Sequence, residues 1–264
     1  GTLSAMSSES REGARPTGDA PDALRRPVPL HVALRPRGPD ASEVPDGGGG
    51  RLGGAGVTRA REEHVAALRA LLGEGAVVVE PHELERYEKG WRYGRGKALA
   101  AVRPSSTEEV SRLLRHASDD GLRVVAQGAN TGLVGASTPD DSGEMLVLSL
   151  ERLDRTIEVD PVDRTVTADG GVLLSRLDAA LAEHGLLFPI DLGADPSIGG
   201  MVATNTGGTR LLRYGDVRQN LLGLEAVLAD GTVLDLTRPL WELYLVEGLD
   251  SFLDLPKDSF AILV

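Results

Sequence analysis

The sequence predicts an α+β fold, and three observations support this prediction. A chain of 264 residues with 41% hydrophobic residues can bury a sizeable core in one or two domains. From residue 58 onward, strand-like apolar runs alternate with segments of helical periodicity. Asp160-Pro161 and Asp230-Gly231 each separate two strand-like runs, which indicates two hairpins.

The first half of the periodic region reads as two helices and three strands. Thr58 is expected to cap a helix that ends at Gly73, with its apolar face toward the core. Ser106 and Glu109 form a capping-box pattern at the start of a second helix, which Gly121 ends. The strands are expected at residues 76–79, 98–102 and 123–126.

The second half is predicted to contain more strands than helices. Residues 145–150 form an apolar, strand-like run, and residues 172–184 have the pattern of an amphipathic helix that Gly185 stops. The two hairpins are expected to pair residues 156–159 with 165–168, and residues 223–228 with 232–236.

Charge and composition exclude several classes of partner. The formal net charge of −12 disfavours nucleic acid and anionic lipid, and no basic patch opposes it. The absence of Cys excludes disulfides, thiolate zinc sites and iron–sulfur clusters, and it fits a reducing compartment. No apolar run approaches the roughly 20 residues of a membrane span. We therefore expect a cytoplasmic protein without a membrane span.

The two ends of the chain differ from its middle in composition. Residues 1–56 contain 11 Gly, 7 Pro and no aromatic residue, so we expect a disordered tail. Residues 241–264 hold four of the nine aromatic residues, one Lys and no Arg. This last segment is set apart as a divergent tail whose structure the sequence leaves undefined.

A Gly-rich loop, residues 127–138, is expected to follow directly after a strand. Its glycines allow positive φ values and can turn several backbone N–H groups toward one point, as a diphosphate requires. The loop contains neither the P-loop lysine nor the GxGxxG spacing of a Rossmann turn. The alternative is an ordinary surface loop that needs glycine for its turns.

A second candidate segment spans residues 188–208. Ser197 is predicted to be a helix N-cap, and Gly199-Gly200 in the first turn would leave the backbone bare for a flat ring or a phosphate. Close helix packing is the alternative, because Gly and Ala also permit it.

Five motifs follow one another along the chain: Val102–Val110, Gly128–Ser137, Pro189–Gly208, Arg213–Gly215 and Leu224–Gly231. Together they resemble the FAD-binding domain of PCMH-type (vanillyl-alcohol-oxidase-like) flavoproteins. The similarity covers roughly residues 60–240 and is strongest to the D-2-hydroxy-acid dehydrogenase group, which includes D-2-hydroxyglutarate and D-lactate dehydrogenases and the glycolate oxidase subunit.

The resemblance implies two α/β subdomains, residues 57–126 and 127–240, with FAD between them. It assigns the pyrophosphate to the first loop and the flavin with its phosphates to the second segment. The cofactor-binding residues carried over are Gly128, Ala129, Asn130, Thr131, Gly132, Leu133, Gly135 and Ser137 in the first loop, and Pro189, Gly193, Ser197, Gly199, Gly200, Thr204, Asn205 and Gly208 in the second segment.

The implied activity is oxidation of the CH–OH group of a D-2-hydroxy acid by hydride transfer to FAD, with a protein or a quinone as electron acceptor. Ala129-Asn130 stands where covalently flavinylated members can carry His, so FAD should be non-covalent. The family's substrate-binding groups lie downstream of the matched part. We therefore expect a chain truncated before the cap domain, with unassigned catalytic residues and little activity alone. A non-catalytic FAD-binding fragment and a PCMH-type oxidase of another alcohol are the alternatives.

The remaining polar residues form no motif that predicts catalysis or metal binding. The sequence contains no HExxH motif and no i,i+4 His pair, so the histidines are expected at the surface and no metal site is predicted. Asp119-Asp120 is expected to be a solvated turn. Arg210 and Arg213 are candidates for binding a phosphate or a carboxylate, and for Arg213, beside Tyr214, anchoring of the turn is the alternative. The histidines concerned are His64, His82, His116 and His184.

Overall fold

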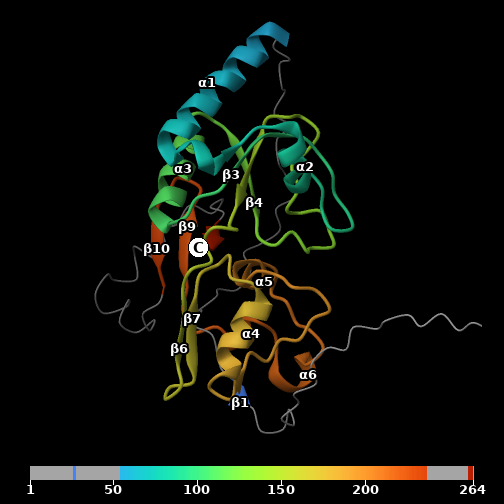
Figure 1. Ribbon diagram of the computed structural model, residues 1–264, viewed down its shortest axis with the longest axis vertical. Coiled ribbons are helices and arrows are strands. Elements are labelled where there is room, and N and C mark those ends of the chain that lie inside the picture. Colours follow the sequence, from blue (N-terminus) through green and yellow to red (C-terminus); the bar gives the residue numbers. More distant parts are fainter. Residues whose placement is uncertain (1–25, 28–53, 237–260, 264) are drawn as a thin grey trace, which may run out of the picture.

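The computed structural model describes residues 26–27, 54–236 and 261–263. Figure 1 shows two lobes, one with α1, α2, α3 and the strands β3 and β4, and the other with α4, α5, α6 and the β6–β7 hairpin. The mixed α and β fold is therefore confirmed. Within the described residues, no helix combines the length and the apolar character needed to cross a membrane.

The first lobe is a four-stranded sheet covered on both faces. Its strand order is β2-β3-β5-β4, in which β3, β5 and β4 are parallel and β2 is antiparallel to β3. The sheet strands are β2 (Val77–Val78), β3 (Ala98–Val102), β4 (Arg123–Gln127) and β5 (Met145–Ser149), and the helices are α1 (Gly54–Leu72), α2 (Pro81–Glu88) and α3 (Thr107–Asp119), with a 3-10 turn at Glu74–Ala76.

Alternation along the strands explains the three layers of this lobe. Leu146 and Leu148 of β5 pack in one core with Leu68 of α1 and Leu113 of α3. Val147, between them, points to the opposite face and packs in another cluster with residues of α2. A strand that is apolar at every position is therefore buried on both sides.

The second lobe has its own core around Phe188, Leu177 and Met201. The β6–β7 hairpin is antiparallel and pairs Val159 with Val166. The elements are β6 (Ile157–Asp160), β7 (Thr165–Ala168), α4 (Leu174–Ala182), β8 (Leu186–Leu187), α5 (Ile198–Thr204), α6 (Leu211–Tyr214) and a 3-10 turn at Arg218–Asn220.

The chain then returns to the first lobe. The antiparallel strands β9 (Glu225–Leu228) and β10 (Val233–Asp235) flank the predicted Asp230-Gly231 turn, and Val227 joins the core of the first lobe. Ser111 Oγ of α3 donates to the Gly231 carbonyl at 2.5 Å. The core of the first lobe includes Leu146 and Leu153 as well as Val227, and the core of the second lobe runs from Val166 to Leu221.

The chain ends contribute two short pairings. β1 (Arg26–Pro27), inside the tail predicted to be disordered, pairs in parallel with β8. β11 (Ala261–Leu263), inside the divergent C-terminal segment, pairs antiparallel with β9. The rest of the two predicted tails, apart from residues 54–56 at the start of α1, lies outside the described residues.

Two local predictions at helix starts need correction. The first helix begins at Gly54, four residues before the expected cap Thr58. Ser106 does cap α3, since its side chain accepts a hydrogen bond from the Glu109 N–H. The Glu109 carboxylate, however, accepts from the N–H and hydroxyl of Ser105 rather than from the N–H of Ser106. The return hydrogen bond of the capping box is therefore made with Ser105, one residue before the expected Ser106.

Candidate FAD site

The Gly-rich loop follows the carboxyl end of β4 and is held at its base by Gln127. This side chain is buried, and its Nε2 donates to the carbonyls of Tyr87 at 2.9 Å and Ser137 at 2.8 Å. The first bond ties the loop to the end of α2, and the second closes the loop on itself. Gln127 therefore fixes the two ends of the loop in one place.

Asn130 anchors the middle of the loop. Its Nδ2 donates to the Lys89 carbonyl at 2.8 Å, and its Oδ1 accepts from Ser137 Oγ at 2.8 Å. Asn130 has a φ of 57°, a left-handed conformation that Asn tolerates better than most residues. Asn130 and Ser137 were both predicted as direct cofactor ligands, and the structure shows that their side chains already serve to shape the loop.

Gly135 lies against the loop that follows α2. A methyl group added to Gly94, whose φ is 86°, would lie 2.8 Å from the Gly135 Cα and 2.4 Å from Thr138 Oγ1. Because Gly135 itself has a φ of 70°, both chains need glycine at this crossing. The segment around Trp91 and Tyr93, both exposed, is therefore brought beside the Gly-rich loop.

Within the described residues, the backbone donors of this loop have no protein acceptor. Among the described residues, no N–H group from Gly128 to Ser137 donates to another protein atom, and the first that does is the N–H of Thr138, to the Gly135 carbonyl. No side chain from Gly128 to Ser137 carries a charge. Hydrogen bonds to a charged group are worth about 1.5–3 kcal/mol each, so several such donors can hold a diphosphate without a cationic side chain.

The two predicted segments meet at Gly128. A methyl group on this residue would lie 2.1 Å from Ser197 Oγ and 3.9 Å from the Gly200 Cα. The structure therefore brings the start of the first loop against the start of α5, as the prediction of one shared site requires. Ser197 is buried, and its Oγ accepts from the Gly200 N–H at 3.3 Å, so it is the N-cap that the sequence predicted.

The backbone donors at the start of α5 are engaged within the protein. The N–H of Ile198 donates to the Val172 carbonyl at 2.8 Å, and that of Gly199 donates to the Gly170 carbonyl at 2.7 Å. Together with the bond from Gly200 to Ser197, these interactions use the first three donors of the helix. A methyl group on Gly199 would lie 2.9 Å from the Gly170 oxygen, so this glycine serves close packing, which was the alternative interpretation.

The remaining residues of the second segment have visible structural roles. Asn205 ends α5 in a left-handed conformation, donates to Asp216 and accepts from the Arg218 N–H. Thr204 Oγ1 donates to the Gly200 carbonyl at 2.9 Å. Gly208, with a φ of 75°, packs on the backbone of Asp191. Pro189 is buried, whereas Gly193 is exposed and an added methyl group there would meet open space.

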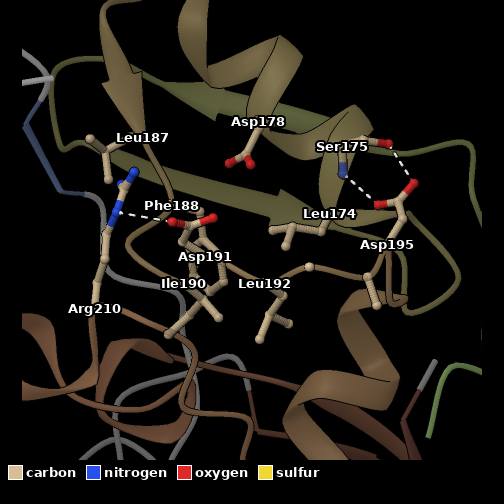
Figure 2. Close-up of a pocket in the computed structure, with 12 residues that line it drawn as sticks. Leu174, Ser175, Asp178, Leu187, Phe188, Ile190, Asp191, Leu192, Asp195 and Arg210 are labelled. Atoms are coloured by element: carbon tan, nitrogen blue, oxygen red, sulfur yellow. Dashed lines mark hydrogen bonds and ion pairs between the residues drawn. The ribbon is translucent and has the colours of Figure 1, made fainter. Parts of the chain in front are cut away.

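A cavity of about 590 Å³ lies beside this segment, between α4 and residues 187–195. Figure 2 shows Asp178, Asp191 and Asp195 around it, with Arg210 as the cation that lines it. Asp195 is fixed by the N–H and hydroxyl of Ser175, at 2.9 and 2.7 Å. Three carboxylates against one guanidinium make this cavity unsuitable for a diphosphate or a hydroxy acid anion, and no residue of the first loop lines it.

The two candidate arginines are engaged within the protein. Arg210 Nε lies 3.7 Å from Asp191 Oδ2, and the Arg213 guanidinium lies 5.0 Å from the centroid of the Tyr214 ring. The second arrangement is a cation–π contact, as expected for an anchored turn. The second observation favours the alternative interpretation that Arg213 anchors a turn.

An ion-pair cluster surrounds Glu151, next to the residue on which the Gly-rich loop is anchored. The Tyr87 hydroxyl donates to Glu151 at 2.8 Å, and the same carboxylate pairs with Arg86 at 2.9 Å and Arg103 at 3.4 Å. Burial, followed by the hydrogen bond to Glu151 and its negative charge, raises the pKa of Tyr87 to about 12. Since the Tyr87 carbonyl accepts from Gln127, this cluster holds the residue on which the loop is anchored.

Sequence reasoning did not assign roles to Gln127, Gly94 and Gly170. Gln127 carried a readable signal, because it is a polar residue at the end of an apolar strand and directly before a Gly-rich loop. Gly170 also carried one, since Gly170-Gly171 follows a predicted strand. A methyl group on Gly171 would lie 2.0 Å from the Leu150 carbonyl, so this pair allows the two lobes to approach closely.

The fold and the Gly-rich site define an FAD-binding domain. A family described as FAD binding domain matches residues 98–237, which is more than half of the chain, and the chain therefore belongs to that family. The match ends close to residue 240, where the predicted resemblance also ends. The predicted resemblance to PCMH-type FAD-binding domains is confirmed.

The most informative relatives are dehydrogenases of D-2-hydroxy acids. D-2-hydroxyglutarate dehydrogenase of Bos taurus is 42% identical over 177 residues, which are 66% of this chain and 32% of that protein. A putative D-lactate dehydrogenase of Schizosaccharomyces pombe is 40% identical over 185 residues, 66% of this chain and 35% of that protein. The chain thus spans about a third of the length of the curated relatives it matches.

Solved structures support the same fold at lower identity. Alkyldihydroxyacetonephosphate synthase superposes with a TM-score of 0.60 at 21% identity, over 66% of this chain and 35% of that one. p-Cresol methylhydroxylase superposes with a TM-score of 0.55 at 22% identity, over 79% of this chain and 43% of that one. These similarities support the assignment of the fold and carry no information about the substrate.

Proposed function

We propose that this chain is the FAD-binding part of a flavin-dependent dehydrogenase of D-2-hydroxy acids, with the diphosphate of FAD in the loop from Gly128 to Ser137. The observation that carries the proposal is the run of unused backbone N–H groups in that loop, next to the start of α5. Family membership supports FAD as the ligand.

The residues of the chain fit this cofactor through shape and hydrogen bonding. Gln127 and Asn130 fix the shape of the loop, and its uncharged backbone donors would hold the phosphates of FAD. When bound, FAD supplies an acceptor for the hydride of the carbon that bears the substrate hydroxyl. The protein's part in this region is to bind and orient the cofactor.

The substrate class is supported by the relatives. Their names specify D-2-hydroxyglutarate and D-lactate as substrates, and identities near 40% make the same class the leading hypothesis here. The electron acceptor, a protein or a quinone, stays a prediction. So does a cytoplasmic location, although both of these relatives are named as mitochondrial proteins.

Non-covalent attachment is the second element of the proposal. The sequence has Ala129-Asn130 in the loop and no His between His116 and His184. If FAD is non-covalent, acid denaturation of the loaded protein will release the flavin into the supernatant. Flavin that remains with the precipitated protein would contradict this part of the proposal.

FAD titration with matched glycine variants tests the site. Gly132 and Gly75 both lack a positive φ, and an added methyl group meets nothing within 4 Å at either position. Gly132→Ala and Gly75→Ala should therefore both fold as the wild type does. We expect Gly132→Ala to weaken FAD binding by about tenfold or more, because the methyl group occupies space beside the phosphates, while Gly75→Ala leaves it unchanged.

Two outcomes would contradict the assignment. A wild-type protein that stays colourless and elutes without flavin would exclude FAD binding. A Gly132→Ala variant that binds FAD as tightly as Gly75→Ala would move the diphosphate away from this loop.

Turnover is a separate claim with its own experiment. The family resemblance assigns the substrate-binding groups to segments beyond the matched residues, so we expect the 264-residue chain to bind FAD with little oxidation of D-2-hydroxyglutarate or D-lactate. An artificial electron acceptor dye reports the rate. Robust oxidation by this chain would overturn that expectation and would leave the binding proposal intact.

A further inference from the structure

Helix α1 lies beside α3 in the first lobe (Figure 1), and three side chains of types that can ligate a metal lie close together here. His64 comes from α1, His116 comes from the last turn of α3, and Asp120 is the C-cap one turn later. His64 Nδ1 lies 3.6 Å from Asp120 Oδ2, and His116 Nε2 lies 3.7 Å from the same oxygen. All three ligand atoms lie within 4.8 Å of one another.

We propose that His64, His116 and Asp120 form a Zn²⁺ site. Two imidazole nitrogens and one carboxylate oxygen are ligands that zinc binds, whereas Mg²⁺ and Ca²⁺ prefer oxygen ligands alone. Tetrahedral zinc with bonds of about 2.1 Å separates its ligand atoms by about 3.4 Å. Two of the observed separations are within a few tenths of an ångström of that value. Water would complete the fourth position.

A second observation at the same place favours a ligand. His116 Nε2 is buried and has no hydrogen-bond partner within the described part of the chain. Buried polar atoms normally have a partner, and a bound cation would satisfy this nitrogen in its deprotonated form. The competing explanation is a plain ion pair between Asp120 and protonated histidines, which predicts no metal binding.

The site is structural rather than part of the flavin chemistry. Asp120 precedes the amino end of β4, whereas the Gly-rich loop follows the carboxyl end of that strand. A five-residue strand separates its ends by roughly 13–17 Å. The metal would therefore link α1 to α3 without reaching the diphosphate, and its binding is independent of the proposed function.

Calorimetric titration of the 264-residue chain with ZnCl₂, after treatment with a chelator, tests the proposal. We expect one equivalent bound. His64→Asn and His116→Asn should each weaken binding by at least the roughly 10–100-fold that even an outer-shell change costs a metal site. His82→Asn and His184→Asn are matched controls at exposed histidines outside the cluster, and they should bind zinc as the wild type does.

Co²⁺ provides a spectroscopic check, because tetrahedral Co²⁺ absorbs visible light far more strongly than octahedral Co²⁺. We expect that band in the wild type and its loss in His64→Asn. Zinc should also raise the unfolding temperature of the wild type and not that of His64→Asn. The His64 and His116 side chains are 27% and 23% exposed, so both variants should fold. Equal zinc affinity in His64→Asn and His184→Asn, or no binding by the wild type, would overturn the proposal.

Discussion

The two Gly-rich segments of this protein look alike in sequence and differ in what their backbones do. In the loop from Gly128 to Ser137, no N–H group is used by another described residue. At the start of α5, the N–H groups of Ile198, Gly199 and Gly200 all have protein acceptors. One segment is open to a ligand, and the other is a packed junction that places Ser197 against the first.

The difference shows that glycine permits two unrelated functions. At Gly199 the missing side chain lets the helix approach the Gly170 backbone, and that contact consumes the donors a phosphate would have used. At Gly132 the missing side chain leaves open space. Which function applies depends on the acceptors nearby, and those come from distant parts of the chain.

The largest effect expected from this comparison is on stability. Gly199→Ala places a methyl group 2.9 Å from the Gly170 oxygen and 3.1 Å from its Cα, and neither backbone atom can move without disturbing the junction. We expect a loss of about 2 kcal/mol in the free energy of unfolding, within the range that overpacking costs. Urea denaturation measures it. The FAD affinity of the folded protein should change much less.

Gly193→Ala is the control for this variant, because it lies in the same segment and its methyl group meets open space. Its stability should match that of the wild type. If Gly199→Ala lowered FAD affinity strongly and left stability unchanged, α5 would be a ligand site and the contrast between the two segments would fail.

Most of the fold could be predicted from the sequence because apolar periodicity determines it locally. The strand at Ala98–Val102 has the bounds that were expected. The predicted hairpin around Asp160-Pro161 is present, with its first strand at Ile157–Asp160, one residue later than predicted. The start of α1 was missed because Gly54 and Gly56 are poor helix formers, so that Thr58 looked like the cap. Periodicity does not encode which elements pair in the folded protein. It therefore could not predict that β5 lies between β3 and β4, or that β9 lies beside α3.

The candidate site was predictable as a set of loops but not as a set of roles. The glycine spacing located Gly128–Ser137, whereas the consumption of the Gly199 N–H by Gly170 requires knowledge of which loops meet. The histidines teach the same lesson. His116 and Asp120 are four residues apart and so share a helix face, but His64 joins them only because α1 packs on α3.

The next effect in size concerns the anchor of the open loop. Asn130→Ala removes the bonds to the Lys89 carbonyl and from Ser137 Oγ, and it places Ala at a φ of 57°. We expect FAD to bind about tenfold more weakly, equivalent to about 1.4 kcal/mol, because the loop must be ordered when the cofactor binds. Flavin fluorescence titration measures the change.

Asn130→Gly separates the two causes, since glycine accepts the positive φ and lacks only the side-chain bonds. An affinity between those of the wild type and Asn130→Ala is expected. If both variants bound FAD as the wild type does, loop preorganisation would be irrelevant, and the donors alone would explain binding.

The smallest expected effect concerns Tyr87, the residue to which Gln127 anchors the Gly-rich loop. Tyr87→Phe removes the phenol that donates to Glu151 but keeps the Tyr87 carbonyl that accepts from Gln127. At neutral pH we expect a loss of about 1 kcal/mol in stability, the usual net contribution of one hydrogen bond, and unchanged FAD affinity.

The pH dependence of the same variant provides its control. Folding raises the pKa of Tyr87 from 10.0 to about 12, so the folded state favours the protonated phenol. The resulting stabilisation is fully present below pH 10 and is lost as the pH rises from 10 toward 12. Ultraviolet titration of the wild type should show one tyrosine that ionises near pH 12, and Tyr87→Phe should lack that step. A Tyr87→Phe variant with weakened FAD binding would contradict this expectation. It would show that the Gly-rich loop depends on the hydrogen bond from the Tyr87 hydroxyl to Glu151 as well as on the Tyr87 carbonyl.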